Sequence, residues 1–197
     1  MNDQTNRRKR QHIEVIGRDA GVERNGRFFD GMQLQHRAMP EINLDDVDPS
    51  VEFMGKQLSF PLLISSMTGG DDVLVAKVNQ HLAEAAQITG VAMGVGSQRV
   101  MLEDSKAQAS FDLRRYAPDA LLFANMGAIQ LNNGMGAAQL QQAIDVLGAD
   151  AIFLHLNPLQ EAVQPEGDTN FANLAQAIGH AQQQLKVPIV LKEVGSG

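Results

Sequence analysis

The chain of 197 residues contains no cysteine and no tryptophan. Without cysteine, disulfide bonds and thiolate metal sites are excluded, and an extracellular location has no support. Aromatic residues make up 5% of the sequence, with a single tyrosine, so the platforms on which single-stranded nucleic acids stack are scarce. No apolar run approaches the length of a membrane span, and the first residues lack the apolar core of a signal peptide. These absences favour a cytoplasmic protein that binds neither membranes nor nucleic acids.

The charge is distributed unevenly along the chain. Residues 1–37 hold eight of the sixteen Lys and Arg residues against five acids, while the remaining 160 residues carry a net charge of −10. A basic arm on an acidic body is typical of nucleic-acid binding, but the scarcity of aromatic residues makes a small anion such as phosphate an equally good target. A solvated amino-terminal arm is the plain alternative. We expect residues 1–58 to form a basic extension that wraps the rest, with a strand or hairpin at Val51–Leu58 that turns at Gly55.

Apolar strands and amphipathic helices alternate over residues 59–197. The predicted strands cover residues 60–67, 91–96, 121–125, 151–157 and 188–194, and the predicted helices cover 73–88, 105–116, 137–147 and 171–185. In the first helix, Asp71 or Asp72 is the expected cap and Gly90 the expected end. Its buried face is predicted from helical spacing at Leu74, Val78, Leu82 and Ala85. Near-continuous apolar strands joined by helices indicate a parallel sheet that is covered on both sides.

Two α/β architectures fit this alternation. A five-stranded doubly wound sheet would be complete at this length, but it concentrates its ligand residues at one switch point. Here every predicted strand ends in polar residues, which is typical of a (β/α)8 TIM barrel. These residues are Met67-Thr68-Gly69-Gly70, Gly96-Ser97-Gln98-Arg99, Asn125, His155-Leu156-Asn157 and Lys192-Glu193. We therefore predict a partial barrel at residues 59–197 with only its first five strands, since a complete barrel typically needs about 250 residues.

The richest polar cluster follows the fourth predicted strand. Side chains alternate along a strand, so His155 and Asn157 share a face at its carboxyl end, and Gln160 and Glu161 follow in the loop. Histidine can act as an acid or base or donate to an anion, and Glu161 is a possible ligand for a hard cation. A structural histidine is the plainer interpretation of His155 alone, but the set of four favours a site.

Lys192 stands within the apolar fifth strand. A buried ammonium without a partner would cost several kcal/mol, so Lys192 is expected to face a ligand or a carboxylate. It could form a Schiff base or stabilise an anionic cofactor. After the first strand, Ser65 to Gly70 offers hydroxyls and unhindered backbone for a flat cofactor or a phosphate.

Taken as an ordered set, these motifs resemble the type 2 isopentenyl-diphosphate isomerase family. The resemblance rests on Arg8-Lys9-x-x-His12-Ile13, Ser66-Met67-Thr68-Gly69-Gly70, Gly96-Ser97-Gln98-Arg99, Asn125, His155-x-Asn157-x-x-Gln160-Glu161 and Lys192-Glu193-Val194-Gly195. It spans nearly the whole chain, which would be an N-terminal portion of such an enzyme. The resemblance implies an FMN-dependent barrel that interconverts isopentenyl and dimethylallyl diphosphate with reduced flavin and Mg²⁺, with NADPH as the reductant, and that forms a homo-oligomer.

The resemblance also implies roles for individual residues. Flavin contacts fall on Ser66, Met67, Thr68, Ser97, Asn125 and Lys192. Substrate contacts fall on Arg8, Lys9, His12, Arg99, His155, Asn157 and Gln160. Glu161 would hold Mg²⁺, and Gln160 and His155 would serve the chemistry.

The predicted last three strands of the barrel are not represented, although the loops after strands seven and eight commonly hold a cofactor phosphate in such barrels. Another FMN-dependent barrel oxidoreductase, such as a 2-hydroxy-acid oxidase, and an inactive half-barrel are the alternatives.

Overall fold

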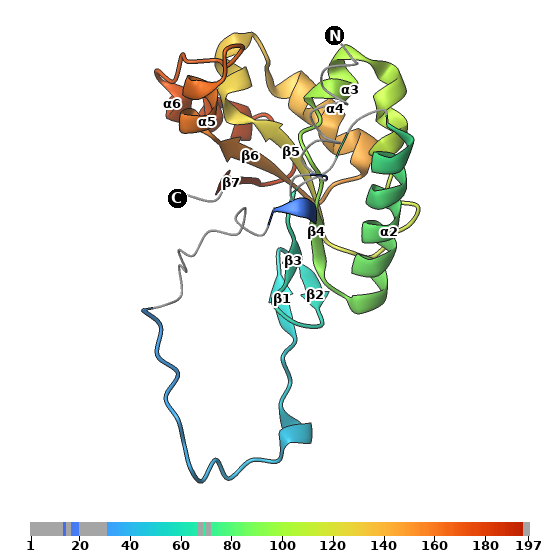
Figure 1. Ribbon diagram of the computed structural model, residues 1–197, viewed down its shortest axis with the longest axis vertical. Helices are drawn as coiled ribbons and strands as arrows, with labels where there is room; N and C mark the ends of the chain where they lie inside the picture. The colour runs from blue at the N-terminus through green and yellow to red at the C-terminus, as the bar shows by residue number, and fades with distance from the viewer. Residues whose placement is uncertain (1–13, 15–16, 20–30, 67–68, 70–71, 195–197) are drawn as a thin grey trace. The chain divides into compact units, whose positions relative to one another are not determined.

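The computed structural model describes residues 14, 17–19, 31–66, 69 and 72–194 (Figure 1). The chain divides into two compact units, Met1–Pro49 and Ser50–Gly197. The described part of the first unit includes a short 3-10 helix, η2 (Leu44–Asp46). No helix in the described ranges combines the length and apolar character needed to cross a membrane. The wrapping of residues 1–58 on the barrel stays a prediction.

The second unit is built on a five-stranded parallel sheet (Figure 1). Its strands are β3 (Leu63–Ile64), β4 (Ala92–Gly94), β5 (Leu122–Gly127), β6 (Ala151–Leu156) and β7 (Ile189–Glu193). Their order in the sheet follows their order in the sequence, and every neighbouring pair is parallel. A doubly wound sheet reverses its order at a switch point, whereas this sheet does not. The predicted partial (β/α) barrel is therefore confirmed.

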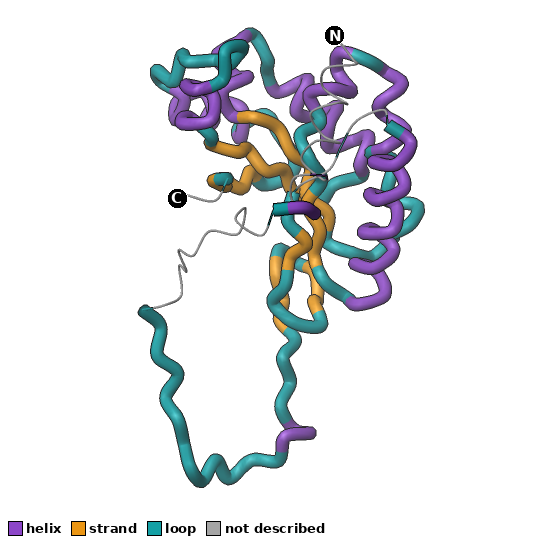
Figure 2. Tube along the Cα trace, viewed as in Figure 1, coloured by secondary structure: helices purple, strands orange, loops and turns teal. Residues whose placement is uncertain are grey.

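Helices connect successive strands (Figure 2). They are α2 (Val73–Thr89), α3 (Arg99–Glu103), η3 (Ser105–Ser110), η4 (Ala128–Asn133), α4 (Ala137–Leu147), α5 (Pro158–Val163) and α6 (Leu174–Gln182). The predicted caps of α2 are confirmed, because Asp72 Oδ1 accepts from the backbone of Leu74 at 2.8 Å and Gly90 ends the helix with φ of 66°. Only glycine adopts that left-handed conformation without strain.

The predicted buried face of α2 is wrong by one position. Val75, Asn79, Ala83 and Ala86 are the buried residues, while Leu74 is half exposed. Asn79 is fully buried because its Nδ2 donates to the carbonyl of Ser110 at 3.1 Å. A polar side chain thus replaces an apolar one on the core face.

The predicted helix at residues 105–116 is also wrong. The chain instead forms α3 and then the 3-10 helix η3, where Asp104 Oδ1 accepts from the backbone of Lys106 at 2.9 Å. The local side-chain bond starts a new turn and so interrupts a continuous α-helix. Helix α5 was not predicted, although Pro158 stands at its first position, where proline is favoured.

The β1–β2 hairpin closes the amino end of the sheet's inner face. β1 (Val51–Phe53) and β2 (Lys56–Leu58) pair antiparallel, as predicted, with Gly55 at φ of 76°. The buried Leu58 packs in one cluster with Phe123 and Phe153, whose rings stack with centroids 4.4 Å apart. These side chains fill the inner face below the carboxyl ends of the strands, and a second, larger cluster joins the other face to the helices.

Gly94 allows the Phe153 ring to cross β4. A Cβ atom at this position would lie 2.8 Å from Phe153 Cε2 and 2.6 Å from Ser66 Oγ. Because the ring is fixed by stacking on Phe123, we expect Gly94→Ala to lower the free energy of unfolding by about 1–3 kcal/mol. Gly179→Ala is the matched control, because nothing lies within 4 Å of its Cβ position in α6; we expect it to stabilise by about 0.5–1 kcal/mol. Urea unfolding measures both changes, and equal effects would contradict the packing at Gly94.

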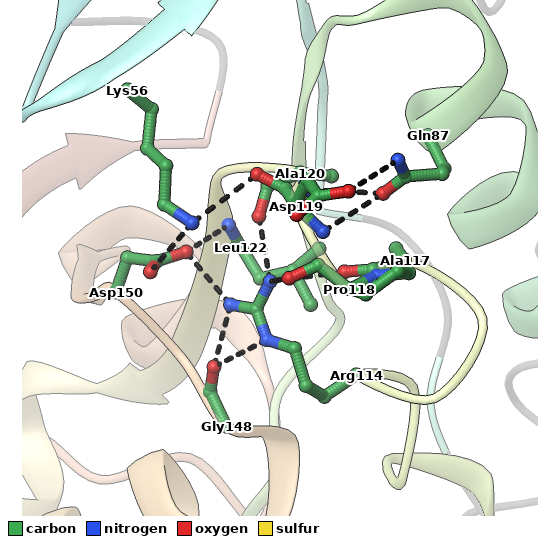
Figure 3. A network of polar contacts seen from close by, with 10 residues as sticks. All are labelled: Lys56, Gln87, Arg114, Ala117, Pro118, Asp119, Ala120, Leu122, Gly148 and Asp150. Atoms are coloured by element: carbon green, nitrogen blue, oxygen red, sulfur yellow. Dashed lines mark hydrogen bonds and ion pairs between the residues drawn. The ribbon is translucent and has the colours of Figure 1, made fainter.

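A network around Arg114 fastens the amino ends of β5 and β6 (Figure 3). Arg114 Nη1 donates to the carbonyls of Ala117 and Ala120 at 2.9 and 2.8 Å. Its Nε and Nη2 atoms both donate to the carbonyl of Gly148, and Nη2 pairs with Asp150 Oδ2 at 2.8 Å. Asp150 Oδ2 also accepts from the backbone of Leu122 at 2.9 Å. Because these groups lie at the edge opposite to the carboxyl ends, the network belongs to the stability of the fold.

Candidate functional site

Three predicted site residues meet at the carboxyl ends of β5, β6 and β7. His155 is opposite Gly127 of β5 and opposite Lys192 of β7 in the strand register. Asn125 lies two residues before Gly127, and its Oδ1 is 2.9 Å from His155 Nδ1. Side chains two residues apart lie on the same face of a strand, so these groups share the edge of the sheet's inner face.

The hydrogen bonds of Asn125 determine the tautomer of His155. Asn125 Nδ2 donates to the carbonyl of Val95 at 2.9 Å. Its Oδ1 therefore faces His155, and an amide oxygen can only accept a hydrogen bond. His155 Nδ1 must then carry the proton and donate it to Asn125. Its Nε2 keeps a lone pair that no other described residue bonds; it lies beside Gly127, where a Cβ atom would be 3.2 Å away.

Burial keeps the imidazole neutral. Desolvation, reinforced by the neighbouring positive charge of Lys192, lowers the pKa of His155 to about 4, against a smaller opposing effect of Glu161. Burial also lowers the pKa of Lys192, with a smaller opposing effect of Glu193. Lys192 Nζ donates to the carbonyl of Glu193 at 2.9 Å.

His155 is expected to make the stability of the protein dependent on pH. The unfolded chain takes up a proton near pH 6.5, whereas the folded chain does so near pH 4. The contribution of the neutral imidazole is therefore complete above pH 6.5 and is lost as the pH falls toward 4, by about 3 kcal/mol in total. In His155→Gln the loss of stability between pH 7 and pH 4.5 should be clearly smaller than in the wild type, as measured by urea unfolding. The control His180→Gln changes an exposed histidine of α6; if both variants keep the wild-type slope, the burial argument fails.

A second cluster of predicted residues forms where β6 runs into α5. The buried Asn157 donates through Nδ2 to Gln160 Oε1 at 3.2 Å and to Glu161 Oε1 at 2.9 Å. Glu161 Oε2 accepts from the backbone of Asp168 at 2.8 Å, and Gln130 Nε2 donates to Asp168 Oδ2 at 3.0 Å. Asp168 and Gln130 were not predicted, because nothing in their sequence context marks a contact between these two loops.

A pocket of about 180 Å³ lies beside His155 and Asn157. Its other walls are apolar and include Ala128 and Ile129 from η4, Leu156 at the end of β6, Pro158, and Leu174 from α6. A pocket with apolar walls and a few convergent polar groups is typical of a small-molecule site. Here a small apolar group could lie against the imidazole.

The remaining predicted residues are placed less tightly. Arg99 is exposed and its Nε pairs with Glu103 Oε1 at 3.3 Å. Ser97 is half-buried just before α3. Arg8, Lys9, His12, Met67 and Thr68 lie outside the described residues. Ser66 follows β3, and its Oγ is buried with no hydrogen-bond partner among the described residues.

Relatives with similar sequences cover nearly the whole chain. The isopentenyl-diphosphate delta-isomerase of Hydrogenovibrio crunogenus is 54% identical over 96% of this chain and 55% of its own length. That of Paracoccus zeaxanthinifaciens is 52% identical over 96% of this chain and 54% of its own length, and that of a Synechocystis strain is 45% identical over 99% and 56%. The chain thus spans about half the length of the curated relatives that it matches.

Two further comparisons agree on the fold. A crystal structure of a mandelate oxidase variant superposes with a TM-score of 0.51 at 16% identity, over 78% of this chain and 48% of that one. At this identity the likeness extends to the fold alone. The sequence model of the FMN-dependent dehydrogenase family matches residues 12–117, which is more than half of the chain. The chain therefore belongs to the FMN-dependent dehydrogenase family.

Proposed function

We propose that the chain carries the active site of an isomerase that interconverts isopentenyl and dimethylallyl diphosphate with reduced FMN and Mg²⁺. The observation that carries this proposal is the identity of 45–54% with three proteins of that name over at least 96% of the chain. The reaction adds a proton to the terminal alkene carbon and removes one from the carbon two positions away, so no net oxidation occurs.

The residues at the carboxyl edge fit a flavin. Ser66 Oγ is buried without a partner among the described residues, so a bound polar group would satisfy it. Lys192 is partly desolvated, and its ammonium would stabilise negative charge on a reduced flavin. The residues that would hold FMN are Ser66, Met67, Thr68, Ser97, Asn125 and Lys192. In the structure, both polar atoms of the Asn125 amide already form hydrogen bonds, with Val95 and His155.

The diphosphate requires positive charge. Arg8, Lys9 and Arg99 would supply it, with His12 as a further substrate contact, and Arg99 would have to exchange its exposed partner Glu103 for the substrate. Glu161 would hold Mg²⁺, because each of its carboxylate oxygens keeps a lone pair beyond its hydrogen bond with Asn157 or Asp168. Among the described residues there is no group of three His, Cys, Asp or Glu side chains that could hold a metal ion. Mg²⁺ is usually bound through one or two carboxylates plus substrate phosphates and water, so the proposal needs only one carboxylate from the protein.

Bound reduced FMN would supply the group that gives and takes the proton of the double-bond shift. The protein's own residues orient the substrate around that group. The pocket beside His155 is apolar and of about 180 Å³, and an apolar cavity of roughly 150 Å³ accommodates benzene, so a five-carbon hydrocarbon fits there. His155 Nε2 can accept a proton or a hydrogen bond within this pocket. A diphosphate nearby would raise the pKa of His155, and the protonated Nε2 would then donate to it.

Gln160 completes the arrangement. Its Oε1 accepts from Asn157, which orients its amide nitrogen as a donor toward the ligand. NADPH as the reductant of the flavin, a cytoplasmic location and a homo-oligomeric assembly belong to the same proposal.

The direct test is conversion of isopentenyl diphosphate by the purified protein with FMN, dithionite and Mg²⁺. Dimethylallyl diphosphate is an allylic ester and hydrolyses in acid, whereas its isomer does not, so the acid-labile fraction measures product. We expect product only when FMN, reductant and Mg²⁺ are all present. Oxidation of a 2-hydroxy acid without isomerisation would instead assign an oxidoreductase, and a folded protein with neither activity would assign an inactive half-barrel.

A further inference from the structure

A fully buried glutamine, Gln98, lies between helix α4 and the candidate site. Its side chain is 0% exposed, and it stands at the N-cap of α3 without making a side-chain capping bond. A buried amide with no partners would cost several kcal/mol. The amide of Gln98 must therefore be satisfied elsewhere.

Gln98 forms hydrogen bonds with both backbone polar groups of Asn125. Its Oε1 accepts from the backbone nitrogen of Asn125 at 3.0 Å, and its own backbone nitrogen donates to the carbonyl of Asn125 at 2.9 Å. Its Nε2 donates to the carbonyl of Ala143 in α4 at 2.9 Å and contacts Met101 Sδ at 3.7 Å. All polar atoms of the side chain are thus used, and they tie Asn125 to α4.

These hydrogen bonds of Gln98 lie just beyond the end of β4, the strand next to β5. The paired residues of β4 and β5 stop at Gly94 and Phe123, whereas β5 continues to Gly127. Beyond that point, the side of Asn125 that β4 would have bonded is bonded by Gln98. A single residue, through its side-chain oxygen and its backbone nitrogen, therefore replaces the missing ladder directly below the site.

The effect of Gln98 reaches His155 through Asn125. The position of the Asn125 backbone directs its Nδ2 to Val95 and its Oδ1 to His155. We infer that Gln98 is a positioning residue that fixes the Nδ1–H tautomer of His155 and so keeps Nε2 free toward the pocket. The kinetic part of this inference rests on the proposed function, whereas the tautomer does not.

The test compares Gln98→Met with Gln87→Met in the whole protein. Gln87 also holds the backbone of the chain next to β5, since its Oε1 accepts from Asp119 and Ala120 at 3.0 and 3.2 Å. It acts at the amino end of the strand, on the opposite edge from His155. Both variants lose hydrogen bonds to backbone groups and should lose thermal stability, but only Gln98→Met should disturb the imidazole.

The readout is the ¹⁵N spectrum of the His155 ring, in which protonated and unprotonated nitrogens give well-separated signals. We expect the wild type and Gln87→Met to show Nδ1 protonated and Nε2 unprotonated, and Gln98→Met to show a mixture of tautomers. We also expect kcat to fall between ~10- and ~100-fold in Gln98→Met with little change in KM. Gln98→Glu retains an acceptor for Asn125 and should recover much of the wild-type tautomer.

Several results would overturn the inference. A wild-type imidazole protonated at Nε2 would do so without any variant, and so would a Gln98→Met protein that keeps the wild-type spectrum and kcat. If Gln98→Met does not fold, Gln98→Glu decides instead: its ¹⁵N spectrum must match the wild type more closely than it matches a free histidine side chain, in which the Nε2–H tautomer is favoured. A wild type that shows the expected tautomer but no isomerase activity would contradict the proposed function and leave the role of Gln98 standing.

Discussion

Replacement of Arg114 by methionine is expected to lower the free energy of unfolding by about 3 kcal/mol, because it removes one side of a partly buried, hydrogen-bonded ion pair. Arg114 binds Gly148 and Asp150 on one side and the carbonyls of Ala117 and Ala120 on the other (Figure 3). Without the guanidinium, these carbonyls and the Asp150 carboxylate lose donors that water replaces only in part. For a chain of this size, the loss corresponds to a decrease in Tm of about 10 °C.

Arg115 provides the matched control for this prediction. Its Nε lies 3.7 Å from Asp112 Oδ2, and both side chains are more than half exposed. Arg115→Met should therefore cost less than about 1 kcal/mol. Arg114→Lys should lose about as much stability as Arg114→Met. The planar guanidinium reaches carbonyl groups on several sides at once, and a single ammonium cannot. Thermal unfolding of the three variants measures their losses of stability. Equal losses at Arg114 and Arg115 would contradict a role for the Arg114 network in holding β5 and β6 together.

Replacement of His155 by glutamine is expected to lower kcat of the isomerisation by about 100-fold or more. Glutamine can still bond to Asn125 Oδ1, but it has no ring nitrogen that can be protonated and then donate to the substrate diphosphate. The flavin contacts proposed for Ser66 and Lys192 do not involve His155. The affinity for FMN should therefore stay close to that of the wild type.

The measurement for this variant is the steady-state rate of dimethylallyl diphosphate formation beside an FMN titration. His180→Gln serves again as the control and should keep the wild-type rate, because His180 lies in the last turn of α6. A His155→Gln protein with unchanged kcat would remove His155 from the chemistry and leave it as a structural histidine. A matching loss of FMN affinity would place the imidazole at the cofactor.

Local sequence signals predicted most of the framework. Helix α4 was predicted at its observed bounds, because Gly148 adopts the left-handed conformation that ends a helix, with φ of 66°. The hairpin around Gly55 and the cap at Asp72 were predicted from equally local sequence signals. The buried face of α2 could not be predicted from spacing, because Asn79 enters the core only through its contact with Ser110, 31 residues away.

The site shows the same division between local and distant contacts. The strand periodicity of β6 placed His155 correctly at the carboxyl edge. Asn157, however, turns toward Gln160 and Glu161 because it lies at the N-cap of α5, a helix that the sequence reasoning missed. The contact between Asp168 and Glu161 joins two irregular segments, for which no periodicity exists. The motif Gly96-Ser97-Gln98-Arg99 did not predict a role for Gln98, since burial of its amide depends on α4 and β5 together.

The measurement that tests the central claim most directly is an equilibrium titration of the purified protein with FMN, followed by flavin absorbance. If the carboxyl edge of β3 to β7 is a flavin site, one equivalent of FMN binds with a shifted spectrum. Lys192→Met should then bind more weakly than the wild type. A folded protein that leaves the spectrum of free FMN unchanged would contradict the account, because the residues gathered at this edge would then serve no flavin.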